Sequence, residues 1–208
     1  MRKGDEMRKA VFIAWLLVIC SFISGCGPGK PEPVRTVPDN VSRDEYNLYR
    51  DVLDQEFQGK GDVVIKERTL IPVNSSEFGG VVRPQMIKEF GKQLNVSLID
   101  AFVQANLKPA AINQDMLGYK TATVLTVDTE KEMFADVQIF YENFRAKYPN
   151  PSRMVEFSRV AFDYKMTRAI VYFGKIFYSG KSSSGSYLFM KKVKGKWVID
   201  KSLAAWSL

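Results

Sequence analysis

The feature that most constrains the fold is a series of strand-like segments in the C-terminal part of the chain. These segments alternate apolar with polar residues or are rich in β-branched and aromatic residues, and hairpin-sized loops separate them. Strands joined by such short loops pair in antiparallel fashion. The sequence therefore predicts a meander sheet built from residues 154–163, 168–178, 186–193 and 197–199.

Helical patterns come before these strands. Ser42 and Glu45 have the spacing of a capping box, and apolar residues at helical spacing continue from there to Phe57. Pro84 suits the first turn of a second helix, and Ser97 is expected to cap a third. Two short β-rich segments, 63–69 and 121–127, lie between the helices. A chain with its helices first and most of its strands last indicates an α+β fold.

The most regular helical pattern spans residues 129–148. Thr129 and Glu132 form a second capping-box signature, and Pro149 ends the pattern. Its apolar face is formed by Phe134, Val137, Tyr141, Phe144 and Tyr148. An aromatic stripe on an amphipathic helix is typical of the core. We therefore expect N-terminal helices followed by a C-terminal antiparallel meander sheet that packs against this long helix.

The first 25 residues have the pattern of an export signal. Arg8 and Lys9 precede an apolar run over residues 10–23, which is shorter than the about 20 residues that a membrane-spanning helix needs. Ile23, Ser24, Gly25 and Cys26 follow directly and resemble the bacterial lipobox. This resemblance implies that the leader is cleaved before Cys26 and that Cys26 carries the lipid, palmitate included.

The leader leaves its start codon open, because Asp5 and Glu6 are unusual residues before an apolar run and Met7 would begin a more regular leader than Met1. The leader and the segment that follows it divide the chain into three predicted parts. These are a lipoprotein signal peptide (1–25), a tether rich in proline and glycine (26–41) and a single α+β domain (42–208).

Residue 27 is glycine rather than aspartate. By resemblance to lipoproteins of two-membrane bacteria, and for a host of that kind, this favours an outer-membrane location, on the periplasmic or the surface side. The expected partners are the membrane, reached through lipidated Cys26, and a protein of the cell envelope.

The inventory of side chains excludes several chemistries. The chain has no histidine, and Cys20 and Cys26 are its only cysteines. A mature chain that starts at Cys26 has no disulfide, Ser-His-Asp triad, Cys-His pair or zinc site built from histidine and cysteine. We expect no cofactor, no metal and no catalytic residue; an enzyme would have to use carboxylate, lysine, tyrosine or serine chemistry.

The charge of the mature chain is mild. The leader holds four of the 30 basic and two of the 23 acidic residues, which leaves a net charge of +5. Nucleic-acid-binding proteins usually carry a denser basic stripe, so no nucleic acid is expected as a partner.

Arg159 is the first candidate binding residue, because it stands in an otherwise apolar strand. A buried arginine needs an anion or hydrogen-bond acceptors. One interpretation is a bidentate anchor for a carboxylate or phosphate ligand. The favoured interpretation is a structural ion pair, for which Glu142 and Glu156 are the partners considered, or a position that faces solvent.

Three tyrosines are the second candidate. Tyr172, Tyr178 and Tyr187 fall on neighbouring predicted strands and could line a ligand pocket with their hydroxyl groups. Packing in the core or across strands is the favoured alternative.

A lysine-rich edge is the third candidate surface. A solvated hairpin that protects a sheet edge is its favoured interpretation, and attraction to anionic lipid head groups is the alternative. The residues are Lys191, Lys192, Lys194, Lys196 and Lys201.

Several C-terminal motifs together suggest a family. The motifs stand in successive predicted strands and turns: Ser158-Arg159-Val160-Ala161-Phe162, Val171-Tyr172, Gly185-Ser186-Tyr187-Leu188-Phe189-Met190-Lys191 and Lys194-Gly195-Lys196-Trp197. The region of about residues 130–200 resembles a loose group of uncharacterised exported bacterial proteins, for which no activity can be carried over. The last hairpin also resembles that of the nuclear-transport-factor-2-like fold, a long helix in a curved sheet.

The leading hypothesis is a membrane-anchored bacterial lipoprotein that acts without catalysis, by binding a ligand or another protein of the cell envelope. A carboxylate-based hydrolase of the envelope is the first alternative, although no paired-carboxylate motif stands out. An immunity or inhibitor lipoprotein is the second.

Overall fold

The computed structural model describes residues 40–59, 61–73, 78–91, 96–136, 139–149, 153–177 and 183–207. All of them belong to one compact unit, Pro33–Leu208. The predicted signal peptide, Cys26, most of the tether and Tyr178 lie outside the described residues. Among the helices within these ranges, none is long and apolar enough to cross a membrane.

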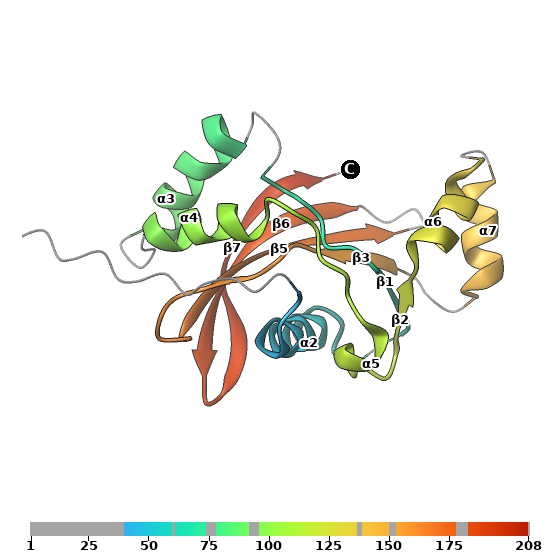
Figure 1. Ribbon diagram of the computed structural model, residues 1–208, viewed down its shortest axis with the longest axis horizontal. Coiled ribbons are helices and arrows are strands. Elements are labelled where there is room, and N and C mark those ends of the chain that lie inside the picture. Colours follow the sequence, from blue (N-terminus) through green and yellow to red (C-terminus); the bar gives the residue numbers. More distant parts are fainter. Residues whose placement is uncertain are drawn as a thin grey trace, which may run out of the picture. The chain divides into compact units, whose positions relative to one another are not determined.

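One open, mostly antiparallel sheet organises the fold, which confirms the α+β class (Figure 1). Its strands lie in the order β2-β1-β3-β5-β6-β7, and β4 pairs with β5 off this path. β5, β6 and β7 are consecutive antiparallel neighbours, as the meander predicted. The strands are β1 (Val63–Lys66), β2 (Ala122–Leu125), β3 (Arg153–Phe157), β4 (Ala161–Phe162), β5 (Arg168–Phe177), β6 (Ser184–Val193) and β7 (Lys196–Ser207).

The two early strands extend the sheet in a way that the sequence patterns did not predict. β1 lies between β2 and β3 and is parallel to both. Parallel neighbours need long crossover connections, and here the chain between β1 and β2 includes three α-helices. Segments that are distant in sequence therefore lie side by side at this end of the sheet (Figure 1).

The helix predicted to start after Ser42 forms as α2. Ser42 Oγ accepts a hydrogen bond from the Glu45 backbone N–H, and the Glu45 carboxylate accepts one from the Ser42 N–H. The helix ends where Gln58 takes a left-handed conformation with φ of 51°. The helical segments are α2 (Arg43–Phe57), the π-helix η1 (Phe78–Val82), α3 (Arg83–Phe90), α4 (Val96–Ala105), α5 (Gln114–Leu117), α6 (Val127–Phe134) and α7 (Phe140–Lys147).

The prediction of one long helix over residues 129–148 is wrong. Thr126 caps α6, and the chain leaves that helix at Phe134 and starts α7 at Phe140. On one straight helix, residues six apart would point about 120° away from each other. Across the break, the rings of Phe134 and Phe140 stack with their centroids 3.9 Å apart. The break thus lets both short helices contribute apolar residues to one small core.

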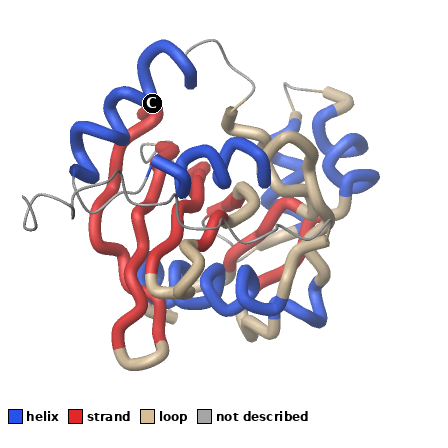
Figure 2. Tube along the Cα trace, turned by 60° about the vertical axis from the view of Figure 1, so that its left-hand side comes forward, coloured by secondary structure: helices blue, strands red, loops and turns tan. Residues whose placement is uncertain are grey.

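The two faces of the sheet carry different layers. α2 packs on one face, where Tyr49 and Phe57 join Val171 and Phe173 in the largest core cluster. Alternate residues of β5 point to the other face. On that face α3 and α4 cover Tyr172, whereas α6 and α7 cover the part that includes Ile176 and Val64. Figure 2 shows the sheet between these layers.

Both edges of the sheet are covered in part by a glutamine side chain. Gln114 donates to the carbonyl of Ala122 and accepts from the Val124 N–H on β2. Gln55 donates to the carbonyl of Trp197 and accepts from the Ile199 N–H on β7. Each side-chain amide replaces the backbone of a missing neighbouring strand, which protects that stretch of edge from pairing with other chains.

Candidate functional site

Arg159 lies in a buried ion pair with Glu45, not with either of the partners considered from the sequence. Its Nε lies 2.8 Å from Glu45 Oε1, and its Nη2 lies 3.1 Å from Glu45 Oε2. Nη2 also donates to the carbonyl of Asn40 at 3.0 Å. The pair joins α2 to the link between β3 and β4, so it has the geometry of the structural alternative.

Each carboxylate oxygen of Glu45 accepts two hydrogen bonds. Oε1 accepts from Arg159 and from the Val160 N–H at 3.0 Å, and Oε2 accepts from Arg159 and from the Ser42 N–H at 2.7 Å. The capping-box residue of α2 is therefore also the counter-ion of the arginine. The capping-box pattern identified Glu45, but it gave no signal of this second role, because the two residues are 114 positions apart.

Side-chain hydrogen bonds help to hold the link between β3 and β4, in addition to the backbone contacts of Ser158 with Leu70 and Tyr172. Asn106 exchanges two hydrogen bonds with the Arg159 backbone, at 2.9 and 3.1 Å. Ser158 Oγ accepts from the Tyr172 N–H, and Tyr49 donates to the Ser158 carbonyl at 2.8 Å. Burial, followed by the charge of Glu45, raises the pKa of Tyr49 well above its ordinary value. These contacts explain why the predicted strand 154–163 is interrupted.

Tyr172 and Tyr187 lie directly opposite each other on β5 and β6, as the sequence suggested. Their ring centroids are 5.4 Å apart in an edge-to-face arrangement. Both rings belong to the core cluster under α3 and α4, with Phe102 as another member. This is the geometry of cross-strand packing.

The hydroxyl groups of the two tyrosines have protein partners. Trp206 Nε1 donates to the Tyr172 hydroxyl at 2.7 Å, and the Tyr187 hydroxyl donates to the Pro72 carbonyl at 3.3 Å. Burial raises the pKa of Tyr172 to about 12, against a smaller lowering by the Trp206 hydrogen bond. A Cβ at Gly185 would overlap both the Tyr172 hydroxyl and the Trp206 indole, so this contact needs glycine there.

A lysine between two carboxylates forms a second polar cluster. Lys66 Nζ lies 3.1 Å from Glu130 Oε1 and 3.3 Å from Glu156 Oε2. Burial lowers the pKa of Lys66, but the two carboxylates together outweigh burial and raise it overall. Both carboxylates are thus engaged by one protonated lysine. This arrangement is that of a structural ion-pair cluster rather than of an acid and a base facing a substrate.

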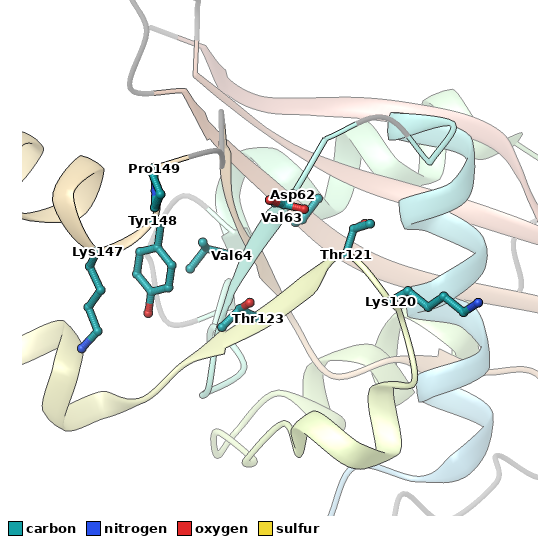
Figure 3. A pocket seen from close by; sticks show the side chains of 9 residues that line it. All are labelled: Asp62, Val63, Val64, Lys120, Thr121, Thr123, Lys147, Tyr148 and Pro149. Atoms are coloured by element: carbon teal, nitrogen blue, oxygen red, sulfur yellow. The ribbon is translucent and has the colours of Figure 1, made fainter.

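A pocket with a volume of about 230 Å³ opens at the N-terminal ends of β1 and β2. The C-terminal end of α7 and the residues that follow it stand beside the strands and form the other wall of the pocket (Figure 3). Val64, Thr121 and Thr123 line the strand side, and Lys147, Tyr148 and Pro149 line the helix side. The sequence did not point to this pocket, because three segments far apart in the chain build it.

The pocket combines an apolar wall with several polar groups. In Figure 3 the Tyr148 ring stands between Lys147 and Val64, while the side chain of Lys120 extends away from it. Burial raises the pKa of Tyr148, so its hydroxyl stays protonated at neutral pH. Lys147 Nζ donates to Thr129 Oγ1 at 3.4 Å. A site of this size suits a small polar molecule or a single side chain of a partner.

Within the described ranges, no group of three or more aspartate, glutamate, histidine or cysteine side chains is placed to hold a metal ion. Comparisons with protein families, with curated proteins and with solved structures find no match to this chain. Its function therefore has to be argued from the residues and their geometry.

Proposed function

We propose that the chain is a lipid-anchored module of the bacterial cell envelope that binds a small polar ligand without transforming it. The leader and Cys26 support export and anchoring in the outer membrane. The observation that carries the binding role is the open pocket beside β2, where polar side chains that include Tyr148 and Thr123 line the walls together with the apolar Val64. The ligand class that fits has an anionic or hydroxyl group next to a small apolar part.

The edge of β2 favours this mode of binding over the addition of a strand. Gln114 already occupies the Ala122 carbonyl and the Val124 N–H, which an added strand would need. A partner protein would then engage the pocket with a side chain rather than with its backbone.

A carboxylate-based hydrolase is the alternative, and Glu130 with Glu156 is the pair that it would use. Two carboxylates of a glycosidase face each other across the scissile bond. Here Lys66 Nζ lies between them and contacts both, so no substrate atom can take that place. This geometry supports a binding role.

The relation to the group of exported bacterial proteins and to the nuclear-transport-factor-2-like fold also belongs to this proposal. The packing of α2 across the antiparallel meander supports it. The parallel pair β1 and β2 is an addition that the resemblance did not imply.

Two experiments test the proposal separately. Metabolic labelling with a palmitate analogue should mark the wild type and not the Cys26→Ala protein, and label that persists on the variant would refute anchoring at Cys26. For the pocket, a panel of small carboxylates, phosphates and sugars is screened by thermal shift.

The binding screen uses one variant that fills the pocket and one matched control. Thr123→Tyr adds a ring inside the pocket on a strand that tolerates aromatic residues, and it should abolish every hit. Ser202→Tyr introduces the same ring at an exposed position of β7 and should keep the hits. Hits that survive Thr123→Tyr lie elsewhere, and release of a cleaved product would favour the hydrolase.

A further inference from the structure

A lysine-rich surface lies at one end of the sheet, where two chain reversals meet. The β4–β5 turn and the β6–β7 hairpin are neighbours, because the Lys192 N–H donates to the Thr167 carbonyl at 2.8 Å. Figures 1 and 2 show the hairpin loop projecting from the sheet. We call this surface the basic end. It consists of Lys165, Lys191, Lys192, Lys194 and Lys196, with Tyr164 and Val193 between them.

The basic end keeps a positive charge after its local partners are counted. Asp200 pairs with Lys191, and Asp163 accepts hydrogen bonds from the backbone and hydroxyl of its own turn. Lys192 lies over the ring of Trp197, with Nζ 5.2 Å from the centroid. Among residues that the structure places, no carboxylate lies within 4 Å of Lys165, Lys194 or Lys196. Lys201 is apart from this surface and donates to the Glu89 carbonyl.

Two large side chains add an apolar component at the tips of both reversals. Tyr164 is 61% exposed and Val193 is 43% exposed. An exposed tyrosine and an exposed valine among lysines match the interfacial region of a bilayer. There, aromatic rings lie at head-group level and lysines contact the phosphates.

The entry point of the tether is close to the basic end. The tether joins the described chain at Asn40, whose carbonyl accepts from Arg159. Tyr164 follows Arg159 by five residues, which span at most about 18 Å. Between Cys26 and Asn40 lie 14 peptide units, at most about 50 Å of chain. A lipid on Cys26 would therefore hold the basic end within reach of the membrane.

The pocket beside β2 lies at the opposite end of the strands. β5 begins at the basic end with Arg168 opposite Lys191, and it ends with Phe177 opposite Arg153. Arg153 is in turn the neighbour of Val63, which lines the pocket. Nine residues of extended chain separate the two ends of β5, about 30 Å.

From these positions we infer that the basic end docks on the anionic surface of the membrane that holds the lipid anchor, and that docking points the pocket away from the bilayer. The inference rests on the proposed anchoring at Cys26. Each lysine near an anionic surface strengthens binding about fivefold, or about 1 kcal/mol. A short tether raises the local concentration of the basic end to the millimolar range, so this weak affinity suffices.

The test uses the mature lipidated protein, with acylation verified by mass spectrometry. Because Cys26 is acylated and no cysteine follows it, Val193→Cys supplies the only free thiol for an environment-sensitive fluorophore. The protein is reconstituted into vesicles of phosphatidylglycerol with phosphatidylethanolamine, and into phosphatidylcholine vesicles. The probe should be quenched by lipid-borne quenchers on the anionic vesicles only, and about 1 M salt should abolish this effect.

Two charge variants and one reporter control decide the outcome. Changing Lys192, Lys194 and Lys196 to glutamine should lower the equilibrium constant for docking by about fivefold for each lysine. Changing the exposed Lys88, Lys108 and Lys131 to glutamine removes the same charge and should leave docking intact. A fluorophore at Met116→Cys on α5 should stay in water.

A Val193 probe that remains in water on anionic vesicles would overturn the docking, as would equal losses in both charge variants. A protein without the acyl mass would instead contradict the anchoring. Its sedimentation with anionic vesicles, compared between the two charge variants, would still test the basic end.

Discussion

Two of the ion-pair sites, Arg159 with Glu45 and Lys66 with Glu130 and Glu156, both join a basic side chain to glutamate but differ in their access to water. The side chains of Arg159 and Glu45 are 4% and 1% exposed, whereas those of Lys66 and Glu130 are 23% and 27% exposed. The first pair is bidentate and fully hydrogen-bonded, and the second shares one ammonium between two carboxylates. Water therefore screens the second site and can replace a lost partner there, but not in the first.

The largest effect is expected from Arg159→Ala. This variant leaves the Glu45 carboxylate buried with only backbone donors, and breaking such a pair lowers the free energy of unfolding by about 3–5 kcal/mol. Urea denaturation measures the loss. Because Glu45→Ala removes the same pair, the double variant should lose much less than the sum of the single variants. A loss below about 1 kcal/mol for Arg159→Ala would mean that the two sites do not differ as their burial suggests.

A smaller effect is expected from Glu156→Gln. The Glu156 side chain is only 9% exposed, but glutamine keeps a hydrogen-bond acceptor there. Lys66 keeps Glu130 as a partner and remains accessible to water, so the loss should be about 1 kcal/mol. It should shrink further at high salt, whereas the loss caused by Arg159→Ala should not. Denaturation of both variants at low and at high salt measures how the loss of unfolding free energy depends on salt. Equal salt dependence would contradict it.

Alkaline pH should weaken the Lys66 site and leave the Arg159–Glu45 pair intact, because lysine loses its proton in this range and arginine does not. The pKa of Lys66 is raised above its ordinary value of 10.5. Its contribution to stability is therefore fully present below about pH 10.5 and is lost as the pH rises through the folded-state pKa. Arginine stays protonated throughout this range, so Lys66→Arg should lose less stability than the wild type above pH 10.5. Thermal unfolding from pH 9 to 12 measures this difference, and parallel curves would contradict it.

The smallest effect is expected from Lys191→Ala at the hairpin. Lys191 lies 2.5 Å from Asp200, but its side chain is 49% exposed. Exposed pairs of this kind change the free energy of unfolding by less than about 0.5 kcal/mol. Denaturation of this variant together with Glu156→Gln and Arg159→Ala shows whether the loss of stability increases with the burial of the ion pair. A loss above 1 kcal/mol would show that exposure does not rank them.

Much of the fold could be read from local patterns, and the candidate site could not. The capping box fixes the start of α2 through contacts between Ser42 and Glu45, which are three residues apart. The meander follows from alternation and short loops. The pocket instead combines Val64, Thr123 and Tyr148, which come from three separate segments. No short motif marks such a meeting, because each residue has an ordinary role in its own element.

The long helix shows where pattern reading fails. Phe134, Phe144 and Tyr148 fit one apolar stripe, and the same residues fit two short helices equally well. What separates these outcomes is the small core into which Phe140 and Phe144 pack with Met154 of β3. Helix propensity is a weak preference that tertiary packing overrides.

The sequence by itself determined α2, the antiparallel meander and the absence of histidine chemistry, because these depend on residue types and on contacts between near neighbours. Only the tertiary structure decided that Glu45 pairs with Arg159, that β1 lies between β2 and β3, and that the pocket exists. Such contacts join residues 59 to 115 positions apart, and they form only where burial of apolar surface brings the segments together.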